Sequence, residues 1–244
     1  MIIHKYKSIF VHIPKVAGQS IESFFLADHG LNWDKRAPML MIENENPELG
    51  PPRLAHLMAS EYCKYQYISE DQFNDYFKFA FVRNPWSRAV SLYKHSKYNL
   101  VMSFKRFVQF ELPKLIKEQQ WFFGQQYDFV HSDNELMVDF IGRFENLDED
   151  FMQVTKSLNI SNAKLTHTNE SKNKKFGSNI QQTVVELIRN PRFVLRYSPD
   201  RVKSKDYRDY YDTHTIQAIN ELYSKDINAF DYSFDTARAG ARHD

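Results

Sequence analysis

Two clusters of residues in this chain have the types and spacing that bind phosphate or a similar anion. In the first cluster, Lys15 is followed by Gly18 and Ser20. Glycine lets a backbone approach a ligand closely, and the N–H groups at the start of a helix favour an anion. In the second cluster, the planar guanidinium of Arg83 suits a phosphate, and Ser91 offers a hydroxyl further along. The predicted chemistry is therefore anion binding at two points.

Two strand-turn-helix units must position these residues. Residues 9–13 are a nearly continuous apolar run, which predicts a buried parallel strand that Pro14 should end. The apolar spacing after Ser20 predicts a helix. Residues 77–82 predict a second strand, which ends at Arg83 before another helix. Two such units favour a parallel sheet flanked by helices, with the ligand crevice at the carboxyl ends of the strands.

The rest of the chain is predicted to alternate loops and helices with one more strand. The expected elements are a long loop at the rim of a site (28–53), a helix (54–65), a helix from Ser103 that Pro113 kinks or ends, a strand (137–144), a helix (147–158), a flexible loop (161–182) and a helix from Thr213. We expect one α/β domain over residues 1–236 and a disordered tail at 237–244.

Composition narrows the classes of function. The 244 residues carry a formal net charge of +1, which argues against a general nucleic-acid binder. The single cysteine, Cys63, cannot form an intramolecular disulfide, so a reducing compartment fits. The sequence has no apolar run of about 18 residues, and its first ten residues lack the apolar centre of a secretory signal. We therefore expect a cytoplasmic protein without a membrane span.

The first cluster differs from the usual nucleoside-triphosphate loop. That loop, GxxxxGK[ST], places its lysine after the second glycine, whereas Lys15 precedes Gly18. A kinase that uses a nucleoside triphosphate is thus a weaker alternative. Taken alone, residues 8–23 also fit an ordinary strand-turn-helix with a surface lysine.

In combination, the two clusters resemble the sulfotransferases that use 3′-phosphoadenosine 5′-phosphosulfate, and within them the carbohydrate sulfotransferase branch, sulfotransferase family 2. The segment IFVHIPKVAGQSIE is similar to the family's loop for the 5′-phosphosulfate, and FAFVRNPWSRAVSLY is similar to its motif for the 3′-phosphate. The segments IGRFENLDEDF and YYDTHTIQAINELYSKDINAFDYSF resemble later parts of the branch. The resemblance implies a P-loop-like, three-layer α/β/α fold with a central parallel sheet.

The resemblance also implies the donor site. Lys15 would stabilise the leaving phosphate, and the backbone from Ala17 and Gly18 through Gln19 to Ser20 would hold the 5′-phosphate. The family often has glycine and threonine where this chain has Ala17 and Gln19. Arg83 and Ser91 would hold the 3′-phosphate.

The base that activates the acceptor hydroxyl is expected to be His56. A histidine is available in its neutral form near pH 7, and His56 resembles a family histidine that is followed by an acidic residue, here Glu61. Glu61 remains an alternative base or an orienting group. His12, inside the first strand, is interpreted as a packed core histidine.

The predicted reaction is metal-independent sulfuryl transfer to a hydroxyl, with a small molecule or glycan, such as a carbohydrate or glycolipid, as the acceptor. A binding protein that keeps the nucleotide pocket without turnover is the alternative from another class. The sequence does not predict the oligomeric state.

Overall fold

The computed structural model describes residues 1–161, 164–165, 185, 202 and 204–235. The chain divides into two compact units. The first unit comprises Met1–Arg83 and Gly124–Thr168 together with Asp235–Asp244, and the second comprises Asn84–Phe123 and Asn169–Phe234. The predicted tail and nearly all of the predicted 161–182 loop lie outside the described residues, and the expectation of a single domain stays a prediction.

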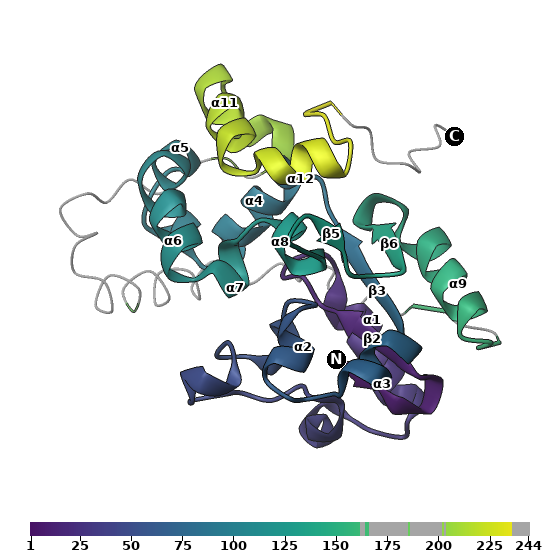
Figure 1. Ribbon diagram of the computed structural model, residues 1–244. Coiled ribbons are helices and arrows are strands. Elements are labelled where there is room, and N and C mark those ends of the chain that lie inside the picture. The colour runs from purple at the N-terminus through teal and green to yellow at the C-terminus, as the bar shows by residue number, and fades with distance from the viewer. Residues whose placement is uncertain (162–163, 166–184, 186–201, 203, 236–244) are drawn as a thin grey trace. The chain divides into compact units, whose positions relative to one another are not determined.

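A four-stranded sheet forms the centre of the first unit (Figure 1). Its order is β1 (Ile2–Ile3), β2 (Ser8–Val11), β3 (Phe77–Val82) and β6 (Phe140–Arg143). The pairs β2/β3 and β3/β6 are parallel, and β1 is antiparallel to β2. The mixed α/β class with a parallel central sheet is confirmed, although the antiparallel edge strand β1 was not predicted.

The register of the sheet places three loops at one edge. Val11 pairs with Ala80, and Val82 pairs with Arg143, so the three parallel strands end close to one another. Because parallel strands share a carboxyl edge, the segments that follow β2, β3 and β6 lie at that edge. Lys15 and Arg83 belong to two of these segments.

Aromatic side chains pack helices α1 (Gly18–Asp28) and α9 (Leu147–Ser157) against this sheet. The rings of Phe10 and Phe79 stack at a centroid distance of 5.1 Å across β2 and β3. Phe25 on α1 contacts both Phe79 and Phe151 of α9. Phe10, Phe25, Phe79 and Phe151 are fully buried or nearly so, and burying each of them contributes roughly 1.5–3 kcal/mol to folding. Figure 1 shows α9 beside β6.

The predicted helix over residues 54–65 is wrong. The structure has a 3-10 helix, η5 (Leu54–His56), and the short helix α2 (Glu61–Lys64). Leu57 between them is extended, with ψ of 139°, and the amide of Ala59 donates to the carbonyl of Phe129, so the helical ladder is broken there. As a result, His56 lies at the end of a turn and not on a helix face.

The other elements of the first unit are short. The predicted 28–53 loop contains the 3-10 helices η2 (Trp33–Lys35), η3 (Ala37–Met39) and η4 (Pro47–Leu49). A helix that the sequence did not suggest, α3 (Glu70–Asp75), precedes β3 and begins with a capping box at Ser69. The remaining elements are η1 (His4–Tyr6), α8 (Gln126–Val130), η8 (Phe144–Asn146) and the hairpin β4 (His131–Ser132) and β5 (Glu135–Leu136).

The second unit is helical in its described part. Its elements are α4 (Pro85–His95), η6 (Tyr98–Leu100), α5 (Phe104–Arg106), a π-helix (Phe107–Glu111), α6 (Leu112–Glu118), α7 (Gln120–Phe123), η10 (Tyr207–Tyr210), α11 (Thr213–Leu222) and α12 (Ser224–Ala229). Pro113 is the second residue of α6, and the chain stays helical from Phe104 to Glu118, so Pro113 does not end the helix and the expected kink stays a prediction. The fully buried Arg88 donates to the carbonyl of Phe122 and lies over the ring of Tyr223.

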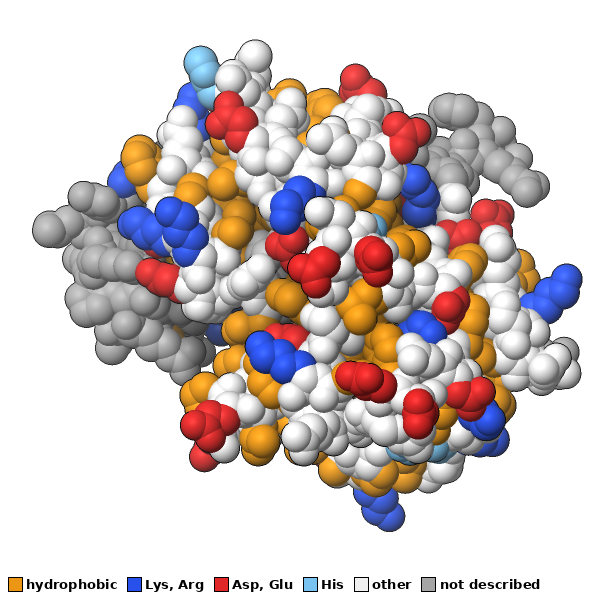
Figure 2. All heavy atoms as spheres, viewed as in Figure 1, with side chains coloured by type: hydrophobic (Ala, Val, Ile, Leu, Met, Phe, Trp, Pro, Cys, Tyr) orange, Lys and Arg blue, Asp and Glu red, His pale blue; other side chains and the backbone are white. Residues whose placement is uncertain are grey.

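Two properties of the described residues bear on the class of protein. None of their helices is both long and apolar enough to cross a membrane. On the face drawn in Figure 2, acidic and basic side chains are interspersed, in keeping with the net charge of +1.

Candidate active site

The loop that joins β2 to α1 has the backbone geometry of an anion-binding nest. Lys15 and Ala17 both have left-handed backbones, with φ of 72° and 69°, and α1 begins at Gly18. Alternating conformations of this kind turn successive N–H groups toward one side. Within the described part of the chain, the amides of Val16, Ala17 and Gly18 are paired with no acceptor. The loop therefore presents backbone donors at the positive end of a helix.

Lys15 places an ammonium group beside this loop. Its side chain is partly buried, and among the described residues it makes no ion pair or hydrogen bond. Burial, with a smaller contribution from the charge of Arg83, lowers the pKa of Lys15 from 10.5 to about 8. A bound anion would strongly stabilise the ammonium form of Lys15, because it would offset both the desolvation of the charge and the repulsion from Arg83.

Arg83 reaches the same loop from the end of β3. Its Nη1 atom donates to the carbonyl of Lys15 at 3.2 Å, and its guanidinium lies 4.1 Å from the ring centre of Phe144, which follows β6. The aromatic face and the carbonyl together fix the direction of the guanidinium. The two cations predicted to bind the donor thus lie together in the first unit.

His12 packs directly beneath Gly18, a contact that the sequence did not predict. A Cβ added to Gly18 would lie 1.9 Å from Nε2 of His12, so the position requires glycine. The Nδ1 atom of His12 lies 2.6 Å from Oε1 of Glu22, and both side chains are almost fully buried. His12 is indeed packed in the core, as predicted, but it lies after β2 and supports the loop together with Glu22 on α1.

His56 is held by the backbone of His12. Its Nδ1 atom lies 3.0 Å from the carbonyl oxygen of His12, and the two imidazole rings are 4.5 Å apart. Because a carbonyl only accepts, Nδ1 carries the proton, and Nε2 of the neutral ring can accept one. Burial, followed by the charge of His12, lowers the pKa of His56 well below its ordinary value. His56 is therefore neutral near pH 7 and has the tautomer that a base needs.

Glu61 has a structural partner. Its Oε2 atom accepts the amide of Met58 at 2.8 Å and so closes the turn between η5 and α2. Burial raises the pKa of Glu61. The hydrogen bond explains why an acidic residue follows His56 in the sequence, because it shapes the turn that carries the histidine.

The structure brings some of the predicted site residues together in the first unit. Hydrogen bonds and ring contacts connect Lys15, Gly18, His56 and Arg83 through His12 and the β2–α1 loop. The side chain of Gln19 is exposed, and the amide of Ser20 donates to the carbonyl of Ala17. Ser91 lies on α4 in the second unit. Its predicted role beside Arg83 stays a prediction.

A metal site is not evident in the described part of the chain, where His, Cys, Asp and Glu do not gather in groups of three that could hold an ion. The expected independence from metals also stays a prediction.

Comparison with known proteins identifies the family. The model of the sulfotransferase family matches residues 1–233, nearly the whole chain. The chain therefore belongs to the sulfotransferase family, and the resemblance noted in its motifs is confirmed. An uncharacterized protein of Archaeoglobus fulgidus is 32% identical over 100 residues, which are 38% of this chain and 76% of that protein. Membership supports sulfuryl transfer as the class of reaction, and that relative adds nothing on the acceptor.

Proposed function

We propose that this protein transfers a sulfuryl group from 3′-phosphoadenosine 5′-phosphosulfate to an acceptor hydroxyl. The observation that carries the proposal is the ammonium of Lys15, which is partly buried, lies beside Arg83 and has no ionic partner among the described residues. Two adjacent cations at the start of a helix are unfavourable unless an anion binds there. A donor with several phosphate and sulfate oxygens supplies that anion.

The 5′ end of the donor would bind to the β2–α1 loop. In this arrangement the loop amides from Ala17 to Gln19 surround the 5′-phosphate, the amide of Ser20 keeps its bond to the carbonyl of Ala17, and Gln19 adds a side-chain donor. Lys15 lies near the oxygen that bridges phosphorus and sulfur. When the sulfur–oxygen bond breaks, negative charge develops on that oxygen, and the ammonium stabilises it.

The 3′-phosphate would bind to Arg83. Its guanidinium can donate in parallel to two phosphate oxygens, a geometry that a single ammonium lacks. Ser91, which follows in α4, would add a hydroxyl. This second point distinguishes the donor from nucleotides without a 3′-phosphate.

His56 would act as the base. The acceptor oxygen attacks sulfur in line with the bridging oxygen, its proton passes to Nε2 of His56, and 3′-phosphoadenosine 5′-phosphate leaves. The proton stays on Nδ1, which keeps donating it to the carbonyl oxygen of His12, so the ring keeps its orientation throughout. Glu61 would orient the turn and take no proton itself.

The finer features of the account follow the family resemblance. The sheet and its helices would form a P-loop-like, three-layer α/β/α arrangement within a single sulfotransferase domain. The acceptor would be a carbohydrate or a glycolipid-like molecule, and the reaction would proceed in the cytoplasm without a metal.

A turnover assay tests this function. The purified protein is incubated with 3′-phosphoadenosine 5′-phosphosulfate and a panel of carbohydrates, glycolipids and small alcohols, and release of 3′-phosphoadenosine 5′-phosphate is measured. We expect release with at least one acceptor and none for Lys15→Ala. If no acceptor supports release although the nucleotide binds, the protein is a binding protein. If turnover instead requires ATP and magnesium, it is a kinase.

A further inference from the structure

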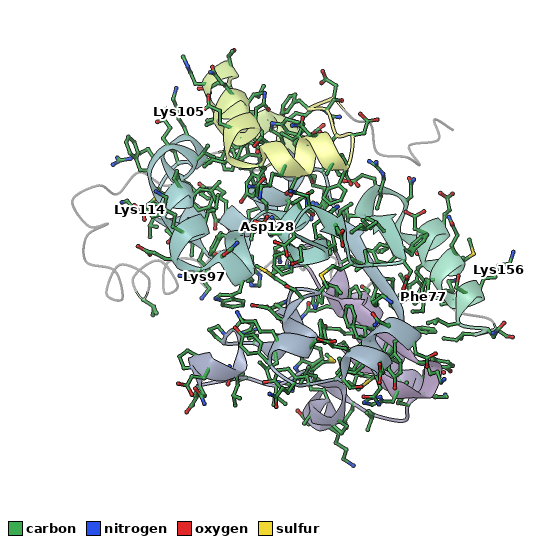
Figure 3. The ribbon with its side chains drawn as sticks, viewed as in Figure 1. Phe77, Lys97, Lys105, Lys114, Asp128 and Lys156 are labelled. Atoms are coloured by element: carbon green, nitrogen blue, oxygen red, sulfur yellow. The ribbon has the colours of Figure 1, made fainter. Side chains whose placement is uncertain are left out.

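Gln126 makes a contact that neither the motifs nor the family match assign to any role. It is the first residue of α8, and its side chain is completely buried. Its Oε1 atom accepts the amide of Arg83 at 2.8 Å, and its Nε2 atom donates to the carbonyl of Arg83, also at 2.8 Å. Figure 3 labels Asp128 on the same helix. One side chain thus satisfies both backbone groups of the arginine predicted to bind the 3′-phosphate.

The contact substitutes for a strand neighbour at the end of the sheet. The last paired residue of β3 is Val82, opposite Arg143 of β6, so the ladder ends one residue before Arg83. A carboxamide offers one acceptor and one donor side by side, as a peptide group does. Gln126 therefore extends the ladder by one residue without a further strand.

The position of this contact in the chain makes it significant. The chain leaves the first unit after Arg83 and re-enters it at Gly124. The hydrogen bonds between Gln126 and Arg83 connect the two places where it leaves and re-enters. Without the contact, the Arg83 backbone would lose the two hydrogen bonds that tie it to α8. For these part-buried N–H and C=O groups the cost is about 0.5–1.5 kcal/mol for each bond.

The position of the Arg83 guanidinium depends on the position of the Arg83 backbone. Arg83 is a long side chain, so a small rotation at its Cα moves its tip by several times as much. At present the tip donates to the carbonyl of Lys15 and lies over Phe144. These contacts hold only if the Cα stays in place, and Gln126 holds it there.

We propose that Gln126 is a positioning residue that sets the preference of this protein for nucleotides with a 3′-phosphate. The inference rests on the proposed function, because it takes Arg83 as the ligand of that phosphate. Gln126 does not touch the nucleotide itself. It acts through the backbone of Arg83.

The test is a titration of four proteins with two nucleotides. Wild type, Gln126→Met, Arg83→Ala and the double variant are each titrated with 3′-phosphoadenosine 5′-phosphate and with adenosine 5′-phosphate. Methionine keeps the volume of glutamine but loses both hydrogen bonds. We expect Gln126→Met to weaken binding of the doubly phosphorylated nucleotide about ten-fold, as expected when one charge-assisted hydrogen bond is lost, and to leave adenosine 5′-phosphate unchanged. In the Arg83→Ala background the same substitution should have no further effect.

A matched control lies at the other end of β3, whose first residue, Phe77, is labelled in Figure 3. There Oδ2 of Asp139 accepts the amide of Lys78 at 2.7 Å. Asp139→Ala therefore also removes a side-chain contact from the backbone of the same strand, together with the ion pair between Asp139 and Nζ of Lys78, away from Arg83. It should lower the melting temperature without changing the ratio of the two affinities.

The outcomes separate the two proposals. If wild type does not prefer the doubly phosphorylated nucleotide, the proposed function fails. If wild type prefers it and Gln126→Met keeps the full preference, or if the substitution has equal effects with and without Arg83, the role of Gln126 is refuted. If Gln126→Met does not fold, Gln126→Asn, which keeps the amide but is one methylene shorter, is titrated against the same criteria.

Discussion

The lowered pKa of Lys15 predicts that donor binding weakens at alkaline pH. An anion is held by the ammonium form, which is present below the pKa of about 8 that burial and Arg83 produce. Between about pH 7 and about pH 9 the protonated fraction of such a group falls about ten-fold, and the dissociation constant should rise by the same factor. The phosphates of the nucleotide are about nine-tenths ionised at pH 7 and change little above it, since their second pKa is about 6.

The substitution Lys15→Arg is the matched control, because an arginine stays charged throughout this range. Isothermal titration with 3′-phosphoadenosine 5′-phosphate should give a dissociation constant that rises with pH for wild type and stays constant for the variant. A constant value for wild type, or the same rise in both proteins, would refute the reasoning.

In the free protein, Lys15 should make the folded state more stable as the pH rises, which is opposite to its effect on donor binding. The pKa of Lys15 lies below its ordinary value of 10.5, so between about 8 and 10.5 the unfolded chain binds more protons than the folded one. The contribution of Lys15 to the free energy of unfolding should therefore increase with pH across this window, whereas below it the penalty for the buried ammonium is fully present. Urea unfolding of wild type and Lys15→Met at both ends of the window measures this difference.

Three further substitutions test the site. His56→Asn should lower turnover about 10²–10⁴-fold and leave donor affinity unchanged, as measured by initial rates and titration, because a base acts only in the chemical step. Gly18→Ala should lower the free energy of unfolding by roughly 1–3 kcal/mol in urea titrations, because its Cβ would lie 1.9 Å from the ring of His12. Ala17→Gly should raise that free energy by up to about 1 kcal/mol, because glycine relieves the left-handed strain at φ 69° but gains freedom when unfolded.

The parallel sheet could be predicted because its signals are local. The apolar runs that form β2 and β3 are short and rich in β-branched and aromatic residues. A cationic residue follows each run closely, Lys15 after the first and Arg83 after the second. The edge strand β1 has only two residues, Ile2 and Ile3, and no pattern of that length can be distinguished from the rest of a chain terminus. The false helix over residues 54–65 arose from an apolar spacing that two long-range contacts override, namely that of Ala59 with Phe129 and that of His56 with His12.

The candidate site could be predicted only where its residues form motifs. Lys15, Gly18 and Arg83 each lie at the end of a predicted strand or the start of a helix, so their types and spacing indicated an anion site. Gln126 and Glu22 gave no such signal. A glutamine at the start of a five-residue helix has no feature that marks it as the partner of a backbone 43 residues away. Such residues become visible only when the fold brings them together.

The central claim is that the paired cations hold a 3′-phosphorylated nucleotide. The most direct measurement is calorimetric titration of wild type and Arg83→Ala with 3′-phosphoadenosine 5′-phosphate, adenosine 5′-phosphate and ATP. The account predicts that wild type prefers the first nucleotide and that the variant loses this preference. Equal binding of all three nucleotides by wild type, or a preference that survives in Arg83→Ala, would contradict it.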